Sequence, residues 1–306
     1  MNQSLSRRSA LRKITGGTAA LAAVASLSHR LQAEEDAARP KLKGNIHHSV
    51  SAWCYDGLFK GGKDKPAKMT FKEFCRECYK LGLESVELLG AGEWPAVKQA
   101  GLTCAMCNGP DNIPYGWNRV EHHDDLLGKF EKAIPQVAEF GFPNIITFSG
   151  NCNGMSHEEG LENCVKGLKR LVPIAEKHKV TVCMELLNSK RDHKDYMCDH
   201  TAWGVDVMKR VGSPRVKLLY DIYHLQIMEG DICRTIKDNF QYLGHFHTGG
   251  NPGRHEIDDT QELNYRFVAK TIADLGYTGY VAHEYSPAQG RDAIASLKQA
   301  MDIFDV

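Results

Sequence analysis

Residues 216–258 read VKLLYDIYHLQIMEGDICRTIKDNFQYLGHFHTGGNPGRHEID. An apolar run at 216–221 predicts a buried strand, residues 228–240 have helical spacing, and residues 242–247 predict a second buried strand. A strand, a helix and another strand in this order are typical of a parallel βαβ unit. Because loops mounted on strand ends often carry chemistry, we expect the functional residues of this chain at such ends.

The same alternation extends in both directions, from residue 46 to residue 304, without an internal break. Strands are expected at 48–54, 85–89, 102–107, 144–148, 180–185, 216–221, 242–247 and 279–284, and helices at 70–81, 93–100, 120–140, 160–178, 202–211, 228–240, 265–275 and 290–304. Eight such units predict an α/β fold, a (β/α)8 TIM barrel that forms a single domain over residues 41–306. The alternative is an open doubly wound sheet, but no Gly-rich dinucleotide-binding turn follows the first strand.

The composition is that of an ordinary globular protein, with 306 residues of which 42% are hydrophobic and 25% are charged. The 38 basic and 38 acidic residues give a formal net charge of zero. This balance argues against a nucleic-acid partner, because phosphate binding usually rests on an excess of Lys and Arg.

Residues 1–40 are expected to be an export signal and a linker that take no part in the fold. Arg7 and Arg8 resemble the pair in a bacterial twin-arginine signal, although Ala10 replaces the usual bulky apolar residue. Residues 14–27 have the length of a signal's apolar region and are too short for a stable membrane span. We expect export to the periplasm, with Ala33 as a candidate cleavage position; the alternative is a disordered basic tail.

The ten cysteines include two pairs with the spacing Cys-x-x-Cys, Cys75 with Cys78 and Cys104 with Cys107. The first pair falls in a predicted helix. The second falls in a predicted strand, where a spacing of three directs the side chains to opposite faces. We therefore expect buried free thiols rather than a four-cysteine zinc site, with disulfides as an alternative in the periplasm.

Four consecutive predicted strands end in side chains that bind metals, namely Glu185, Asp221, His247 and Glu284. In a TIM barrel the catalytic residues stand at the carboxyl ends of the strands, so these four should meet. A lone Glu at a strand end is usually a surface or ion-pair residue, but a buried carboxylate needs a partner or a metal. Three carboxylates and one imidazole suit a divalent ion such as Mn²⁺, Mg²⁺, Co²⁺ or Zn²⁺.

Further polar residues follow the predicted strands and are candidates for the same site. They are Glu87, Asn108, His224, Arg254 and Glu256. Two of them have simpler alternatives, since His224 could cap the following helix and Arg254 could be a surface residue of a mobile loop. His245 and His283 are expected to face the barrel wall.

These motifs resemble the hydroxypyruvate isomerase branch of the xylose isomerase-like sugar isomerase and epimerase barrels. The resemblance spans roughly residues 46–304 and is strongest in the second half. It rests on the segments 184–188 (MELLN), 220–230 (YDIYHLQIMEG), 252–256 (PGRHE), 263–265 (LNY) and 276–287 (GYTGYVAHEYSP).

The resemblance implies that Glu185, Asp221, His247 and Glu284 bind the metal, and that Glu185 and Glu284 also act as acid and base. It implies that His224, Arg254 and Glu256 hold substrate oxygens, and we add Asn108 and Glu87 as substrate-binding candidates. The expected partner is a small sugar or hydroxy-keto acid, in a protein that is homo-oligomeric as relatives often are. One position departs from the pattern, because that branch usually has glutamine where this chain has His247, whereas the ketose 3-epimerase branch has histidine.

Such a site would isomerise or epimerise a hydroxy-carbonyl compound. A proton next to a carbonyl is too weakly acidic for a carboxylate alone, but a metal that binds the carbonyl and the neighbouring hydroxyl stabilises the enediolate. One Glu then removes the proton and the other returns it, at the adjacent carbon or on the opposite face.

Three other interpretations remain open. A lyase or dehydratase of the same superfamily would expel a group from the same enediolate. An apurinic endonuclease barrel needs three zinc ions, bound by further histidines at strand ends. The second to fourth predicted strands end instead in Glu87, Asn108 and Ser149, which argues against this interpretation. A non-enzymatic, exported sugar-binding barrel is the last, and the intact set of four metal-binding side chains argues against it.

Overall fold

The computed structural model describes residues 39–61 and 66–306, and the predicted twin-arginine signal lies outside these ranges. Residues Leu42–Val306 form one compact unit. Within the described ranges, no helix has both the length and the apolar character that crossing a bilayer requires.

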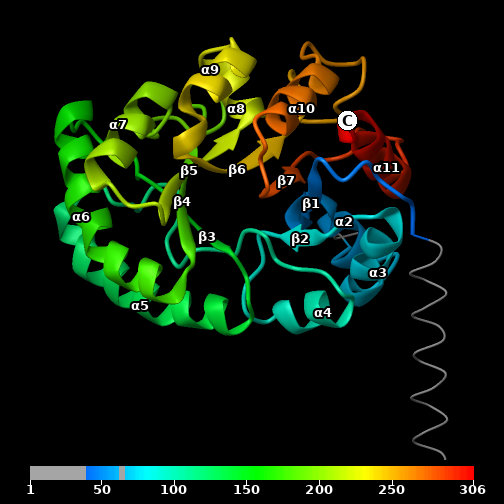
Figure 1. Cartoon of the computed structure of the whole chain (residues 1–306), viewed down its shortest axis with the longest axis horizontal. Helices are drawn as coiled ribbons and strands as arrows, with labels where there is room; N and C mark the ends of the chain where they lie inside the picture. Colours follow the sequence, from blue (N-terminus) through cyan, green and yellow to red (C-terminus); the bar gives the residue numbers. More distant parts are fainter. Residues whose placement is uncertain (1–38, 62–65) are drawn as a thin grey trace, which may run out of the picture. The chain divides into compact units, whose positions relative to one another are not determined.

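A parallel sheet of seven strands curls through the centre of this unit, in the order β2-β1-β7-β6-β5-β4-β3 (Figure 1). The strands are β1 (His47–Ser51), β2 (Ser85–Glu87), β3 (Asn144–Thr147), β4 (Thr181–Leu186), β5 (Val216–Asp221), β6 (Leu243–Thr248) and β7 (Tyr280–His283). Every registered pair is parallel, which is what helical connections between successive strands produce. The fold is therefore TIM-barrel-like.

The prediction of a regular strand at 102–107, the third of the eight expected, is wrong. This segment makes isolated parallel bridges instead, from Thr103 to Ser85 in β2 and from Cys107 to Leu89 and Ile145. Side chains interrupt its ladder, because the N–H of Ala105 donates to Ser85 Oγ and the carbonyl of Ala105 accepts from Asn144 Nδ2. The segment still lies between β2 and β3, the two edge strands of the sheet.

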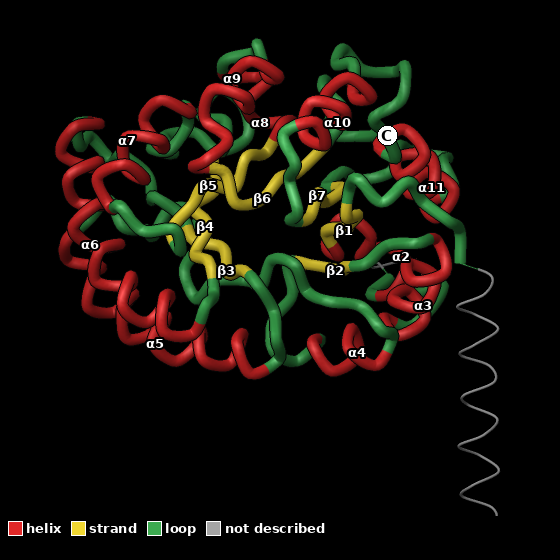
Figure 2. Tube along the Cα trace, in the orientation of Figure 1, coloured by secondary structure: helices red, strands yellow, loops and turns green. Residues whose placement is uncertain are grey.

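Helices lie outside the sheet, as α5, α6 and α7 do around β3, β4 and β5 (Figures 1 and 2). The helices are α3 (Phe71–Leu81), α4 (Trp94–Gln99), α5 (His123–Glu139), α6 (His157–His178), α7 (Thr201–Val211), α8 (Ile222–Met228), α9 (Ile232–Asn239), α10 (Tyr265–Asp274) and α11 (Ala293–Phe304), with the short turns η1 (Ala52–Tyr55), α2 (Asp56–Phe59), η2 (Val120–His122) and η3 (Phe240–Tyr242).

Two connections differ from the predicted elements. The helix expected at 228–240 begins only at Ile232, as α9, after Gly230 and Asp231, whose φ angles of 69° and 44° are left-handed. A further helix, α8, follows β5 directly, where none was expected. The residues directly after β1, expected to continue the strand to residue 54, turn into η1. Both differences place side chains over the carboxyl ends of the strands.

Alternation along the strands decides which side chains point into the barrel. A small interior cluster of Met106, Ile146, Cys183 and Leu219 is separate from the main core between sheet and helices. Because residues two apart on a strand share a face, the interior set continues toward the strand ends as Glu185 after Cys183, Asp221 after Leu219, and His247 after His245.

Two predicted orientations differ from the structure, that of His245 and that of the pair Cys104 and Cys107. His245 does not face the barrel wall but points into the interior beside His247, whereas His283 packs against Phe304 of α11 on the helix side. The sulfurs of Cys104 and Cys107 lie 3.7 Å apart instead of on opposite faces, because their segment is not a regular strand. All ten cysteines are free.

Candidate metal and substrate site

Four side chains from the ends of four neighbouring strands come together in the structure. Glu185, Asp221, His247 and Glu284 each offer a ligand atom, and these atoms lie within 4.8 Å of one another. The Nδ1 atom of His247 is 2.6 Å from Glu284 Oε2 and 3.4 Å from Glu185 Oε1. All four residues are buried, so the group forms a compact, strongly acidic centre.

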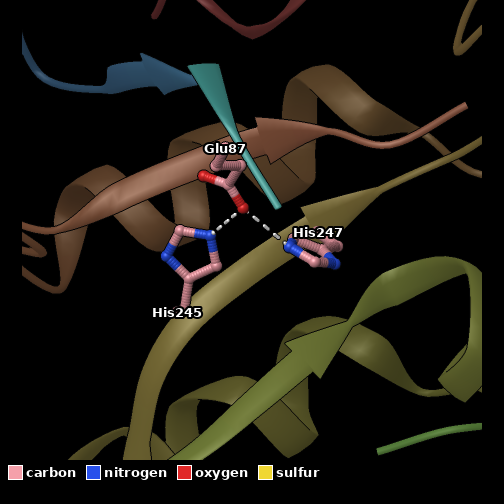
Figure 3. Close-up of side chains that lie close together, drawn as sticks. All are labelled: Glu87, His245 and His247. Carbon is pink, nitrogen blue, oxygen red and sulfur yellow. Dashed lines mark hydrogen bonds and ion pairs between the residues drawn. The ribbon is translucent and has the colours of Figure 1, made fainter. Parts of the chain in front are cut away.

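A second group lies behind His247 and fixes the orientation of its ring (Figure 3). The Nε2 atoms of His245 and His247 are 2.8 and 2.9 Å from the same oxygen, Oε1 of Glu87, while Ser49 Oγ donates to Oε2. Burial alone would raise the pKa of Glu87, but the two imidazoles lower it to about 2. Glu87 therefore stays ionised and holds Nε2 of His247, which leaves Nδ1 facing the acidic centre.

The donor set fits a divalent cation. Nδ1 of His247 is buried and makes no hydrogen bond of acceptable geometry, despite its short distances to two carboxylates. Burial raises the pKa of Glu185 and raises that of Asp221 to about 7. The protein's own cations thus do not supply enough positive charge to keep every carboxylate of the centre ionised, and a bound dication would supply it.

Arg254 is the main cation that the chain itself brings to this centre. Its Nη2 atom lies 2.9 Å from Asp221 Oδ2 and 2.7 Å from Glu284 Oε2. The guanidinium is stacked between the rings of Trp53 and Tyr223, at 5.4 and 5.1 Å from their centroids. Because only 18% of its side chain is exposed, Arg254 is not the surface arginine of the simpler alternative.

His224 lies in the first turn of α8, three residues after Asp221, and faces the same centre. Asp221 itself is the N-cap of α8, because its Oδ1 accepts from the N–H of Tyr223 at 2.8 Å. His224 is thereby released from the capping role, and its Nε2 lies 3.5 Å from Asp221 Oδ2 without a hydrogen bond. Burial lowers the pKa of His224 well below its usual value, so the ring is neutral.

A cavity of about 490 Å³ opens beside the acidic centre. Among the residues predicted from the sequence, it is lined by Asn108, Glu185, His224, Arg254 and Glu284. Glu87 and Glu256 do not line it. Glu256 is buried elsewhere, where its carboxylate accepts from the backbone N–H of Ala288 and from Ser296 Oγ, so it ties its loop to α11 and to the segment before it.

Several lining residues were not singled out from the sequence. Trp53 donates from Nε1 to Glu284 Oε1 at 2.8 Å, and Asp111 and His193 line other parts of the cavity. Trp53 was placed inside a predicted strand, and Asp111 lies in the loop that follows the irregular segment 102–107. Position was an available signal for Asp111, which comes shortly after the predicted strand end at residue 107. No such signal marked Trp53, because the predicted strand includes it.

Residues 76–304 match the family described as "Xylose isomerase-like TIM barrel". The 2-oxo-tetronate isomerase of Cupriavidus necator is 38% identical over 114 residues, which cover 37% of this chain and 43% of that protein, so less than half of its length is matched. The hydroxypyruvate isomerase of Escherichia coli is 30% identical over 206 residues, covering 67% of this chain and 73% of that protein. A crystal structure titled as an AP endonuclease, family 2, from Brucella melitensis superposes with a TM-score of 0.68 at 24% identity, covering 82% of this chain and 96% of that one, which shows a shared fold.

Proposed function

Since the chain belongs to the xylose isomerase-like TIM barrel family, we propose that it is a divalent-metal-dependent isomerase of a hydroxy-carbonyl compound or sugar. The observation that carries the proposal is the buried group of three carboxylates and one imidazole at the edge of the cavity. The names of the two curated relatives, a hydroxypyruvate isomerase and a 2-oxo-tetronate isomerase, support the same reaction class.

The four residues would hold Mn²⁺, Mg²⁺, Co²⁺ or Zn²⁺ through carboxylate oxygens and Nδ1 of His247. A bound dication would stabilise the negative charge that develops on two neighbouring oxygens when a carbon next to a carbonyl loses its proton. Glu87 contributes by fixing the ring of His247 from the opposite side.

Proton transfer falls to Glu185 and Glu284, which line the cavity as well as the acidic centre. One carboxylate takes the proton from the hydroxyl-bearing carbon next to the carbonyl, and the other returns a proton to the former carbonyl carbon, while the hydroxyl proton passes to the former carbonyl oxygen. Trp53 orients Glu284 through its hydrogen bond to Oε1. Arg254 and neutral His224 lie close enough to this centre to hold substrate oxygens.

The test is a product analysis by NMR in D₂O with Mn²⁺ or Co²⁺ supplied, covering hydroxypyruvate, free ketoses and 3-keto sugars. We expect metal-dependent deuterium incorporation at the carbon next to the carbonyl, together with an isomerised product. Absence of both with every substrate and metal would contradict the proposal. A new alkene or a released group would assign the site to a lyase or dehydratase instead.

A ketose 3-epimerase is the second candidate, and His247 favours it. Histidine at this position is the pattern of the epimerase branch in the sequence resemblance, whereas the isomerase branch has glutamine. The two reactions share the first proton transfer and differ in where the proton returns. A product with inverted stereochemistry at an unchanged carbonyl position would identify the epimerase.

Export is proposed separately, on the paired Arg7 and Arg8 and the apolar segment 14–27. Replacing both arginines by lysine should retain the protein in the cytoplasmic fraction, because the twin-arginine route requires that pair. An unchanged periplasmic fraction in the double variant would contradict this route.

A further inference from the structure

The cavity has two chemically different walls. The reactive wall consists of the acidic centre and its neighbours, including Glu185, Glu284, His224 and Arg254. The far wall comes from the first half of the chain and combines the polar residues Asn108 and Asp111 with apolar ones such as Leu88, Ile113 and Phe148. A substrate held by its reacting end at the first wall would extend its other end toward the second.

Asp111 is fixed on the far wall by donors from β3 and the residue after it. Its Oδ2 accepts from Thr147 Oγ1 at 2.5 Å and from the N–H of Phe148 at 3.0 Å. Thr147 Oγ1 in turn accepts from Nε1 of the buried Trp117, so the hydroxyl hydrogen of Thr147 is committed to Asp111. The carboxylate is therefore held in one orientation.

The other oxygen, Oδ1 of Asp111, is buried and has no hydrogen-bond partner within the described part of the chain. The loop packs closely here, since a Cβ on Gly109 would come within 2.6 Å of this oxygen and 2.1 Å of the carbonyl oxygen of Ile146. An unpartnered buried acceptor destabilises a protein unless a donor reaches it. Burial raises the pKa of Asp111 to about 7, which is consistent with an acceptor that lacks a donor.

Positive charge is confined to the reactive wall. Among the described residues that line the cavity, Arg254 alone carries a permanent positive charge, and it already pairs with Asp221 and Glu284. Burial lowers the pKa of both His193 and His224, so neither ring adds a charge at neutral pH. A phosphate or carboxylate at the far wall would find no cation and would face Asp111 instead.

We propose that this site takes substrates whose far end is a neutral, hydroxylated chain, and that the carboxylate of Asp111, which lines the cavity, accepts a hydrogen bond from a hydroxyl of that chain. Asp111 is then a specificity-determining residue that favours free sugars over compounds with a phosphorylated or carboxylated far end. A site built to receive a hydroxyl rejects a group that cannot donate to it, and a like charge adds to the penalty. The inference rests on the proposed function for which end of the substrate meets the acidic centre.

The test compares equilibrium binding of D-xylulose and D-xylulose 5-phosphate by titration calorimetry at about pH 8, with Mn²⁺ supplied. The two probes differ only at C5, where a charged phosphoryl ester replaces the hydroxyl. The wild-type protein should bind the free ketose at least about tenfold more tightly than the phosphate. Equal binding, tighter binding of the phosphate, or no binding of the free ketose would each overturn the proposal.

Asp111→Asn removes the charge while its amide oxygen still accepts from Thr147 and Phe148. It should reduce the preference for the free ketose several-fold, mainly by improving binding of the phosphate. The matched control is Asp56→Asn, an aspartate in the neighbouring cavity that does not line this one, and it should leave the preference unchanged. An unchanged preference in Asp111→Asn, or the same loss in both variants, would overturn the role of Asp111.

Because the titration compares affinities and needs no conversion of either ligand, this result stands apart from the proposed reaction. Discrimination by charge in a protein that isomerises nothing would refute the reaction and keep the inference. Isomerase activity without discrimination would refute the inference and keep the reaction.

Discussion

The two walls of the cavity are held in place by different parts of the fold. The reactive wall is set by the sheet, because the four candidate metal-binding residues stand at the ends of β4, β5 and β6 and just after β7. The far wall is set by loop hydrogen bonds, such as those that Asp111 accepts from Thr147 and Phe148. This difference indicates that reactivity and selection for the far end of the substrate are separable. Substitutions on one wall should change turnover, and substitutions on the other should change preference.

The largest expected effect is on the reactive wall. Glu185→Gln and Glu284→Gln should each lower kcat by about 10³-fold or more, because an amide neither takes nor returns the proton. Deuterium incorporation followed by NMR measures the loss, and circular dichroism checks the fold. Glu93→Gln, at an exposed glutamate before α4, is the control and should keep full activity. An active Glu185 or Glu284 variant would show that the acid and base are wrongly assigned.

Metal affinity should fall in two steps that follow distance from the acidic centre. His247→Ala removes a ligand atom and should weaken Mn²⁺ binding by more than about 100-fold, whereas Glu87→Gln, which only loosens the ring of His247, should cost about 10- to 100-fold. Equilibrium dialysis with metal analysis measures both. His200→Ala, at an exposed histidine before α7, is the control. Metal content that does not change in His247→Ala would show that the ligand set is wrong.

The sheet-borne wall could be predicted from the sequence and the loop-borne wall could not. Glu185, Asp221 and Glu284 close apolar runs, and the end of a buried strand is a position that a short pattern defines. His245 was misplaced although the rule of alternate faces, applied to His247, gives its orientation. Asp111 and Trp53 depend on long-range contacts, with Thr147 and with Glu284, which no local pattern contains. The segment 102–107 failed as a strand for the same reason, since side chains of β2 and β3 take its backbone bonds.

On the far wall, Asp111 should make stability depend on pH. Burial raises its pKa from 3.8 to about 7, so between these values the folded protein binds more protons than the unfolded chain. The free energy of unfolding contributed by this group therefore falls as pH rises through that range. Asp111→Asn lacks the effect, and its stability relative to the wild type should increase by roughly 3–4 kcal/mol from about pH 4 to pH 8. Urea unfolding at both pH values measures it, and a constant difference would contradict the burial of an ionisable carboxyl at this position.

The smallest expected effect lies where the two walls meet, at Trp53. Its Nε1 donates to Glu284 Oε1 and its ring covers Arg254, so it contributes a hydrogen bond and a stacking surface to the reactive wall. Trp53→Phe removes the hydrogen bond and keeps most of the ring, and it should lower kcat by about fivefold, which corresponds to about 1 kcal/mol. Trp53→Ala also removes the ring and should raise KM as well.

A matched control separates orientation of Glu284 from general loss of a tryptophan hydrogen bond. Trp203 donates from Nε1 to the carbonyl of His157 on the outer helices, so Trp203→Phe removes a similar bond far from the cavity and should leave kcat unchanged. If Trp53→Phe also leaves kcat unchanged, Glu284 does not need this donor, and the bond between the two walls is structural. If instead it changes the preference between D-xylulose and its phosphate, the walls are coupled through Trp53, and reactivity and selection are not separable.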